Sequence, residues 1–107
     1  VLFDDLLIER NFGSLEGKKI DYKQMELLWD YKLNDSSNDV ESLRKCLLRA
    51  KRFLAKIKKE YDNKTLLIVS HGSFIKALHY NLKGYNKDTD FLSFKPLNSS
   101  LYIYELK

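Results

Sequence analysis

The 107-residue sequence has little of what cross-links or interrupts a chain: one cysteine, one proline and four glycines. The single thiol, Cys46, excludes an internal disulfide and a multi-cysteine zinc knuckle. Scarce glycine and proline, with apolar residues spread along the chain, argue against disorder. No apolar run approaches the roughly 20 residues of a membrane span. We therefore expect one globular domain over residues 1–107. The lone thiol and many lysines fit the reducing cytoplasm.

Histidine is also scarce, with only His71 and His79. Two histidines and one cysteine are too few ligands at a suitable spacing for a metal site, so we expect neither a metal nor another cofactor.

The charge balance is mildly basic, with 19 Lys and Arg against 15 Asp and Glu, a net charge of +4. Eight of the basic residues lie between Arg44 and Lys59. That stretch also carries a helical apolar stripe, and the basic face opposite such a stripe is usually just solvated. An anionic small molecule, a nucleic acid or no partner at all would suit this charge. The sequence has no aromatic–basic RNA motif and no helix-turn-helix spacing, which argues against a nucleic-acid partner.

Apolar periodicity predicts three helices. The first covers residues 20–29, and the second covers residues 40–61, with Asn38 and Glu41 as a capping box at its start. The third covers residues 73–82 and ends at Gly84, a good residue for a helix C-terminus.

Four segments are expected to be strands. Residues 5–9 fit a short buried strand, and the continuous apolar run at residues 65–70 fits a central strand buried on both faces. Residues 91–94 and 101–106 are expected to pair as an antiparallel hairpin. The pattern indicates an α/β domain.

His71 lies where the expected central strand ends and a helix begins, within Ser70-His71-Gly72-Ser73. Open α/β sheets bind ligands at the carboxyl ends of their strands, and a helix N-terminus favours anions. His71 could thus hold a phosphate oxygen, or it could simply cap the strand. Chemistry alone does not choose between them.

The segment Glu9-Arg10-Asn11-Phe12-Gly13-Ser14-Leu15-Glu16-Gly17 follows another expected strand end. A carboxyl group beside a phosphate site is a candidate general acid, and Arg10 offers a planar fork for phosphate. The alternative is that Glu9 and Arg10 form a surface ion pair.

Four motifs in order resemble the histidine phosphatase superfamily, which includes phosphoglycerate mutase. They are Glu9-Arg10-x-Phe12-Gly13-x-x-Glu16-Gly17, Glu41-Ser42-Leu43, Val69-Ser70-His71-Gly72 and Pro96-Leu97-Asn98-Ser99-Ser100. The resemblance implies a three-layer α/β/α fold with a mixed sheet, incomplete in this chain. It also implies a phosphorylated small-molecule substrate and no membrane partner.

By this resemblance, Glu9 would be the proton donor and His71 the second histidine, which holds the phosphoryl group beside the nucleophile. Arg10 and the Gly72 N–H would contact phosphate or substrate, and Asn98 would support the pocket by hydrogen bonding. His79, eight residues past His71, is expected to be a surface or packing residue.

The sequence also departs from the family, because the Arg-His-Gly tripeptide that carries the nucleophilic histidine is absent. We therefore expect a C-terminal portion that is inactive alone and belongs to a phosphatase or mutase. The short chain end after the last expected strand favours the phosphatase. The alternative is a non-catalytic module that binds an anion, a nucleic acid or a partner chain. A serine hydrolase has less support, since the Gly-x-Ser-x-Gly elbow is absent.

The resemblance also implies that the strand at residues 65–70 lies between two strands of the missing segment, so that both of its edges would be open in this chain. Unpaired backbone groups on a buried strand are costly. We therefore expect completion by a second copy, by the missing N-terminal segment or by a rearranged strand order.

Overall fold

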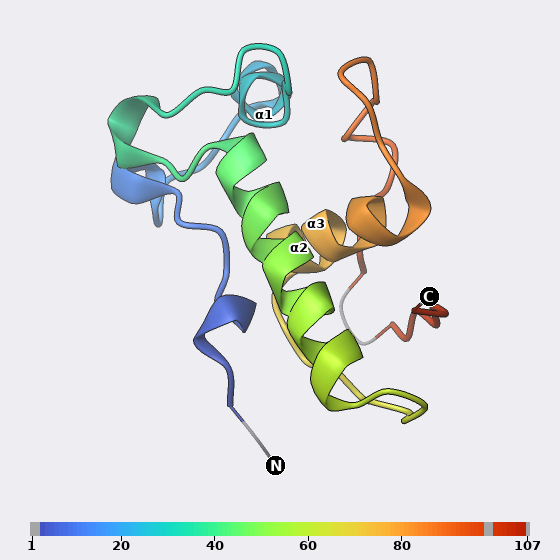
Figure 1. Cartoon of the computed structure of the whole chain (residues 1–107). Coiled ribbons are helices and arrows are strands. Elements are labelled where there is room, and N and C mark those ends of the chain that lie inside the picture. Colours follow the sequence, from blue (N-terminus) through green and yellow to red (C-terminus); the bar gives the residue numbers. More distant parts are fainter. Residues whose placement is uncertain (1–2, 98–99, 107) are drawn as a thin grey trace.

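The computed structural model of the chain describes residues 3–97 and 100–106, which form α-helices and short 3-10 helices joined by irregular segments (Figure 1). In chain order the elements are η1 (Asp5–Leu7), η2 (Gly13–Leu15), α1 (Tyr22–Leu28), η3 (Ser37–Asp39), α2 (Leu43–Glu60) and α3 (Gly72–Lys83). Within the described residues, no helix has the length and apolar character needed to cross a membrane.

The three expected helices are confirmed, and their ends follow local capping chemistry. The Asp21 side chain accepts a hydrogen bond from Gln24 N at the start of α1. At the end of α3, Gly84 has a φ of 93° and donates its N–H to Tyr80 O. Glycine adopts this backbone conformation without the strain that a side chain would add.

The start of α2 differs from the expected capping box. Ser42, not Asn38, is the N-cap, and its side chain accepts from Lys45 N. Asn38 lies in η3 with a φ of 58°, a conformation that asparagine tolerates better than most residues. Glu41 lies before the helix, and its carboxylate instead pairs with Arg49.

The core lies where α2 packs against α3. The buried face of α2 repeats every three or four residues: Leu43, Cys46, Leu47, Ala50, Phe53 and Ile57. From α3, Phe74, Ala77 and Leu78 are buried against it. Asn81 crosses this contact by donating its amide to Leu47 O at 3.0 Å. The basic residues of α2 mostly point to solvent, as the stripe predicts.

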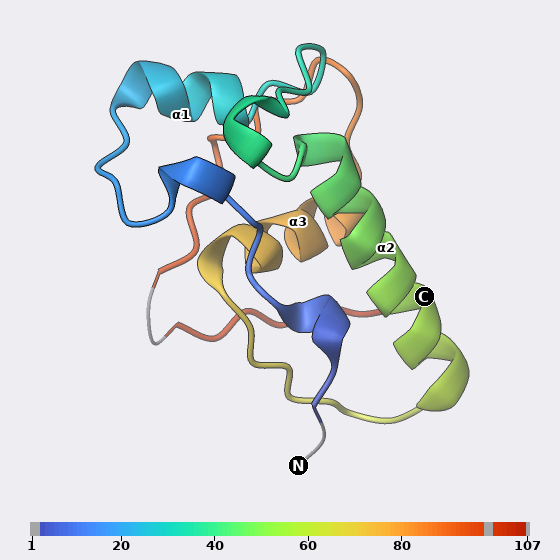
Figure 2. The ribbon, with the colours of Figure 1, turned by 90° about the vertical axis from the view of Figure 1, so that its left-hand side faces the viewer.

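The predicted strands are wrong for the described residues, since no β-ladder forms within residues 3–97 and 100–106. Residues 5–7 form the 3-10 turn η1, and residues 91–93 form a turn closed by Ser93 N and Asp90 O. Residues 65–70 and 101–106 are free of helix (Figure 2). A strand needs a hydrogen-bonded neighbour, and these segments have none in the described part of the chain.

The expectation that residues 65–70 are buried on both faces is also wrong, because Leu67 is 80% exposed and Val69 is 79% exposed. In the last segment Ile103 is 85% exposed. The sheet expected from the sequence is thus not formed here, and Leu67, Val69 and Ile103 face outward, whereas Phe91 is buried.

Arg49 of α2 fixes the N-terminal segment to the helical core. Its Nη1 donates to the carbonyls of Leu6 at 2.7 Å and Ile8 at 2.8 Å. Its Nη2 and Nε donate to the Glu41 carboxylate, each at 3.0 Å. The guanidinium also lies 4.5 Å from the centroid of the Phe74 ring. One side chain thus joins three parts of the chain.

We predict that Arg49→Met lowers the free energy of unfolding by about 2–4 kcal/mol, because it leaves two carbonyls without this donor and leaves the partly buried Glu41 carboxylate without its cation. Urea unfolding followed by the fluorescence of Trp29 measures this. The control Arg52→Met, at an exposed position of the same helix, should change stability by less than about 0.5 kcal/mol. Equal stability of the two variants would contradict the role of Arg49.

We also predict that the chain self-associates through its exposed apolar segments, because an extended apolar segment pairs readily with another chain. Light scattering at several concentrations should show dimers, and Val69→Lys should shift the population toward monomer. Leu33→Lys, at an exposed position of a polar loop, is the control. A wild-type monomer at every concentration would show that these segments do not pair.

Candidate active site

Two segments far apart in the sequence meet at the N-terminus of α3. Glu9 Oε1 accepts from Phe74 N at 3.1 Å, and Oε2 accepts from Ser73 N at 3.4 Å. Nearby, Ser70 Oγ donates to Leu7 O at 2.7 Å. The Glu9 carboxylate thus occupies the positive end of the helix, where unpaired N–H groups favour an anion.

His71 is the N-cap of the same helix, and its carbonyl accepts from Ile75 N at 2.8 Å. It caps the helix through its backbone, and the residue is exposed. The space around Gly72 is open: apart from its chain neighbours and the backbone of its own helix, no atom lies within 4 Å of where a Cβ would be. A ligand can therefore approach the backbone here closely. The structure brings Glu9, His71 and Gly72 to one place, as the sequence predicts.

Arg10 is buried and is not open to solvent, since it is only 1% exposed. Its Nε donates to Glu41 O at 2.8 Å, and Nη1 and Nη2 have no hydrogen-bond partner. The guanidinium lies 5.0 Å from the Trp29 ring centroid and 5.3 Å from that of Phe12. Burial lowers its pKa below the usual arginine value.

The sequence also singled out Asn98 and His79. Asn98 lies outside the described residues. His79 packs, as expected: its ring stacks on Phe94 with centroids 3.8 Å apart, and Nδ1 lies 2.6 Å from Tyr104 Oη. Burial lowers the pKa of His79, with Lys83 adding to the effect.

A cleft of about 570 Å³ adjoins the N-terminus of α3. Glu9, Gly72 and Ser73 line it together with Lys76 and Lys95. The rest of its lining is the acidic residue Asp21 and six largely apolar residues: Ile20, Tyr22, Met25, Trp29, Leu92 and Pro96. Sequence reasoning missed Lys76 and Trp29 as site residues. The available signal was a lysine among the buried positions 74, 77 and 78 of the third helix.

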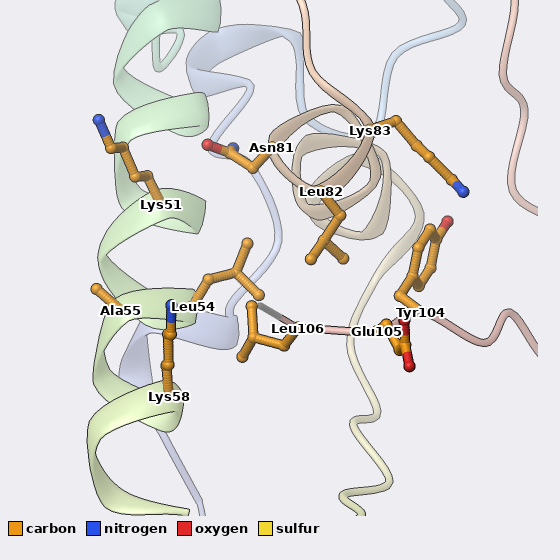
Figure 3. Close-up of a pocket in the computed structure, with 10 residues that line it drawn as sticks. All are labelled: Lys51, Leu54, Ala55, Lys58, Asn81, Leu82, Lys83, Tyr104, Glu105 and Leu106. Carbon is orange, nitrogen blue, oxygen red and sulfur yellow. The ribbon is translucent and has the colours of Figure 1, made fainter. Parts of the chain in front are cut away.

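A second hollow, of about 580 Å³, lies between α2, α3 and the C-terminal segment. Leu54, Leu82 and Leu106 point toward one another across it, and Lys51, Lys58 and Lys83 also line it (Figure 3). Among the described residues, none of the candidate site residues lines this hollow.

Comparison with known families agrees with the motifs. The model of the histidine phosphatase superfamily (branch 1) matches residues 1–107. No curated protein and no solved structure matches the chain significantly. The family implies a phosphoglycerate mutase-like α/β fold, of which the described residues show helices but no strands. Because the match covers the whole sequence, the chain belongs to the histidine phosphatase superfamily, branch 1.

Proposed function

We propose that Glu9 and His71 are the proton donor and the second histidine of a phosphohistidine-dependent enzyme. The enzyme would be a phosphomonoester phosphatase or a phosphoglycerate mutase-like phosphotransferase that acts on a phosphorylated small molecule. One observation carries the proposal: the Glu9 carboxylate reaches the first turn of the helix that His71 caps, across 64 residues of sequence. Family membership supports the same chemistry.

The N-terminus of α3 would hold the phosphoryl group. A phosphate oxygen accepts N–H hydrogen bonds at such an end and gains from the helix dipole. His71 is the exposed N-cap of the same helix, and its imidazole would bind a second oxygen as a hydrogen-bond donor. In this role His71 steadies the group during its transfer.

Glu9 would supply the proton to the leaving alkoxide. Its carboxylate now accepts from the Ser73 and Phe74 N–H groups that a phosphate would use. An arriving phosphate would therefore compete with Glu9 for these N–H groups. Substrate binding would thus free the Glu9 carboxyl group from the helix, beside the leaving oxygen to which a general acid gives its proton.

The nucleophile has to come from outside these 107 residues. The sequence has no Arg-His-Gly, and its other histidine, His79, is stacked on Phe94 two turns along α3. We propose that another segment or chain supplies the phosphorylated histidine and completes the sheet beside residues 65–70.

We predict that the purified chain does not hydrolyse para-nitrophenyl phosphate. General acid catalysis contributes about 10²–10⁴-fold and cannot replace the covalent step. The assay includes His71→Ala as the control for contamination. Turnover that disappears in His71→Ala would show that the chain carries its own nucleophile.

We predict that inorganic phosphate binds weakly at the N-terminus of α3 and that Glu9→Gln strengthens this binding several-fold, because the substitution removes the competing carboxylate. A phosphate titration followed by NMR should move the amide signals of residues 71–74. The control Glu16→Gln changes a carboxylate just after η2 that accepts a hydrogen bond from Phe12 N. This variant should bind phosphate as wild type does. Shifts confined to α2 would place the anion site elsewhere and contradict the proposed function.

A further inference from the structure

Lys76 is an almost buried residue whose ammonium group has no acceptor among the described residues. The residue is 6% exposed, and its Nζ lies 4.0 Å from the centroid of the Trp29 ring. Within the described residues, no hydrogen bond or ion pair involves this nitrogen. The contact with an aromatic face offsets only part of the cost of removing an ammonium from water. The Lys76 ammonium group therefore has no protein anion as its partner in the described part of the chain and is available to an anionic ligand.

The surroundings of Lys76 are positive on balance. Asp90 is the acidic residue that acts on it, and it lies beyond ion-pair distance, while Lys95 and Arg10 oppose its charge. Burial lowers the pKa of Lys76 to about 8, which leaves most of the side chain charged at pH 7. Of the charged residues that line the cleft, Lys76 and Lys95 would attract an anion, and Glu9 and Asp21 would oppose it. An anion beside the Lys76 ammonium would gain most, because that group has no acceptor in the part of the chain that the structure describes.

Lys76 also lines the cleft that begins at Glu9 and Gly72. Six of the twelve residues that line the cleft are largely apolar, and they favour a leaving group with an apolar body. A substrate with its phosphoryl group at the N-terminus of α3 has to place its leaving group in an adjoining space. This cleft adjoins that N-terminus and contains the acid that would protonate the leaving oxygen.

We propose that the cleft binds the leaving group of the substrate, that this group has an apolar body with its own anionic substituent, and that Lys76 is the positioning residue for that anion. The inference rests on the proposed function for the place of the phosphoryl group. It goes further in naming the leaving-group class and the residue that selects it.

The single tryptophan gives a direct readout, because Trp29 is in contact with Lys76 and lines the cleft. We would titrate the chain with phenylphosphonate, 4-carboxyphenylphosphonate and benzoate while following its fluorescence. The carboxylated phosphonate should bind at least about tenfold more tightly than phenylphosphonate, as a charge-assisted contact requires. Benzoate alone should also change the fluorescence.

Three variants separate positioning from packing. Lys76→Met keeps the side-chain volume and should reduce the preference for the carboxylated probe to about onefold, with phenylphosphonate affinity unchanged. Lys76→Arg keeps the charge and should retain most of the preference. Lys83→Met, at an exposed position of the same helix, is the control and should behave like wild type.

The preference measured in wild type decides the proposal even if Lys76→Met does not fold. No preference there, or a preference that survives in folded Lys76→Met, would overturn it. Inorganic phosphate separates the two proposals. Phosphate shifts at residues 71–74 without a benzoate response would overturn this inference alone. A Lys76-dependent benzoate response without phosphate shifts would overturn the proposed function and the leaving-group assignment.

Discussion

The contacts of the Arg49 guanidinium are those on which the rest of this structure depends. Without a sheet to hold it, the segment before η2 has few apolar residues buried against the helices. Arg49 replaces that support with hydrogen bonds to the carbonyls of Leu6 and Ile8, and Glu41 balances its charge. Because a guanidinium presents several donors in one rigid plane, a single side chain can fix two segments at once.

This attachment has a direct consequence for the site. Ile8 is followed by Glu9, so fixing the Ile8 carbonyl brings the Glu9 side chain to the first turn of α3. The same guanidinium lies against the ring of Phe74, and the backbone N–H of Phe74 donates a hydrogen bond to the Glu9 carboxylate. The candidate acid and the helix that would hold phosphate are therefore positioned by one charged network. That network leaves His71 exposed for a partner group.

In the proposed function, the cleft beside that network is the place where the helical part of the chain would select its substrate. Trp29, at the end of α1, meets Lys76 of α3 there, and Arg10 lies against the same indole. The positive charges of Lys76 and Arg10, both close to the Trp29 ring, repel each other. An anionic ligand would reduce that repulsion. The cleft would therefore prefer an anionic leaving group, whichever residue carries out the phosphoryl transfer.

The sequence by itself determined the helices, because their 3.6-residue apolar periodicity and capping residues act locally. It also determined the family and the grouping of Glu9 with His71, through motifs at α3 and before η2. The strand patterns at residues 65–70 and 101–106 did not decide structure, because a strand exists only with a hydrogen-bonded neighbour. Only the tertiary structure decided the roles of Arg49, Lys76 and Trp29. Their roles depend on contacts between residues from 8 to 47 positions apart, which no local pattern encodes.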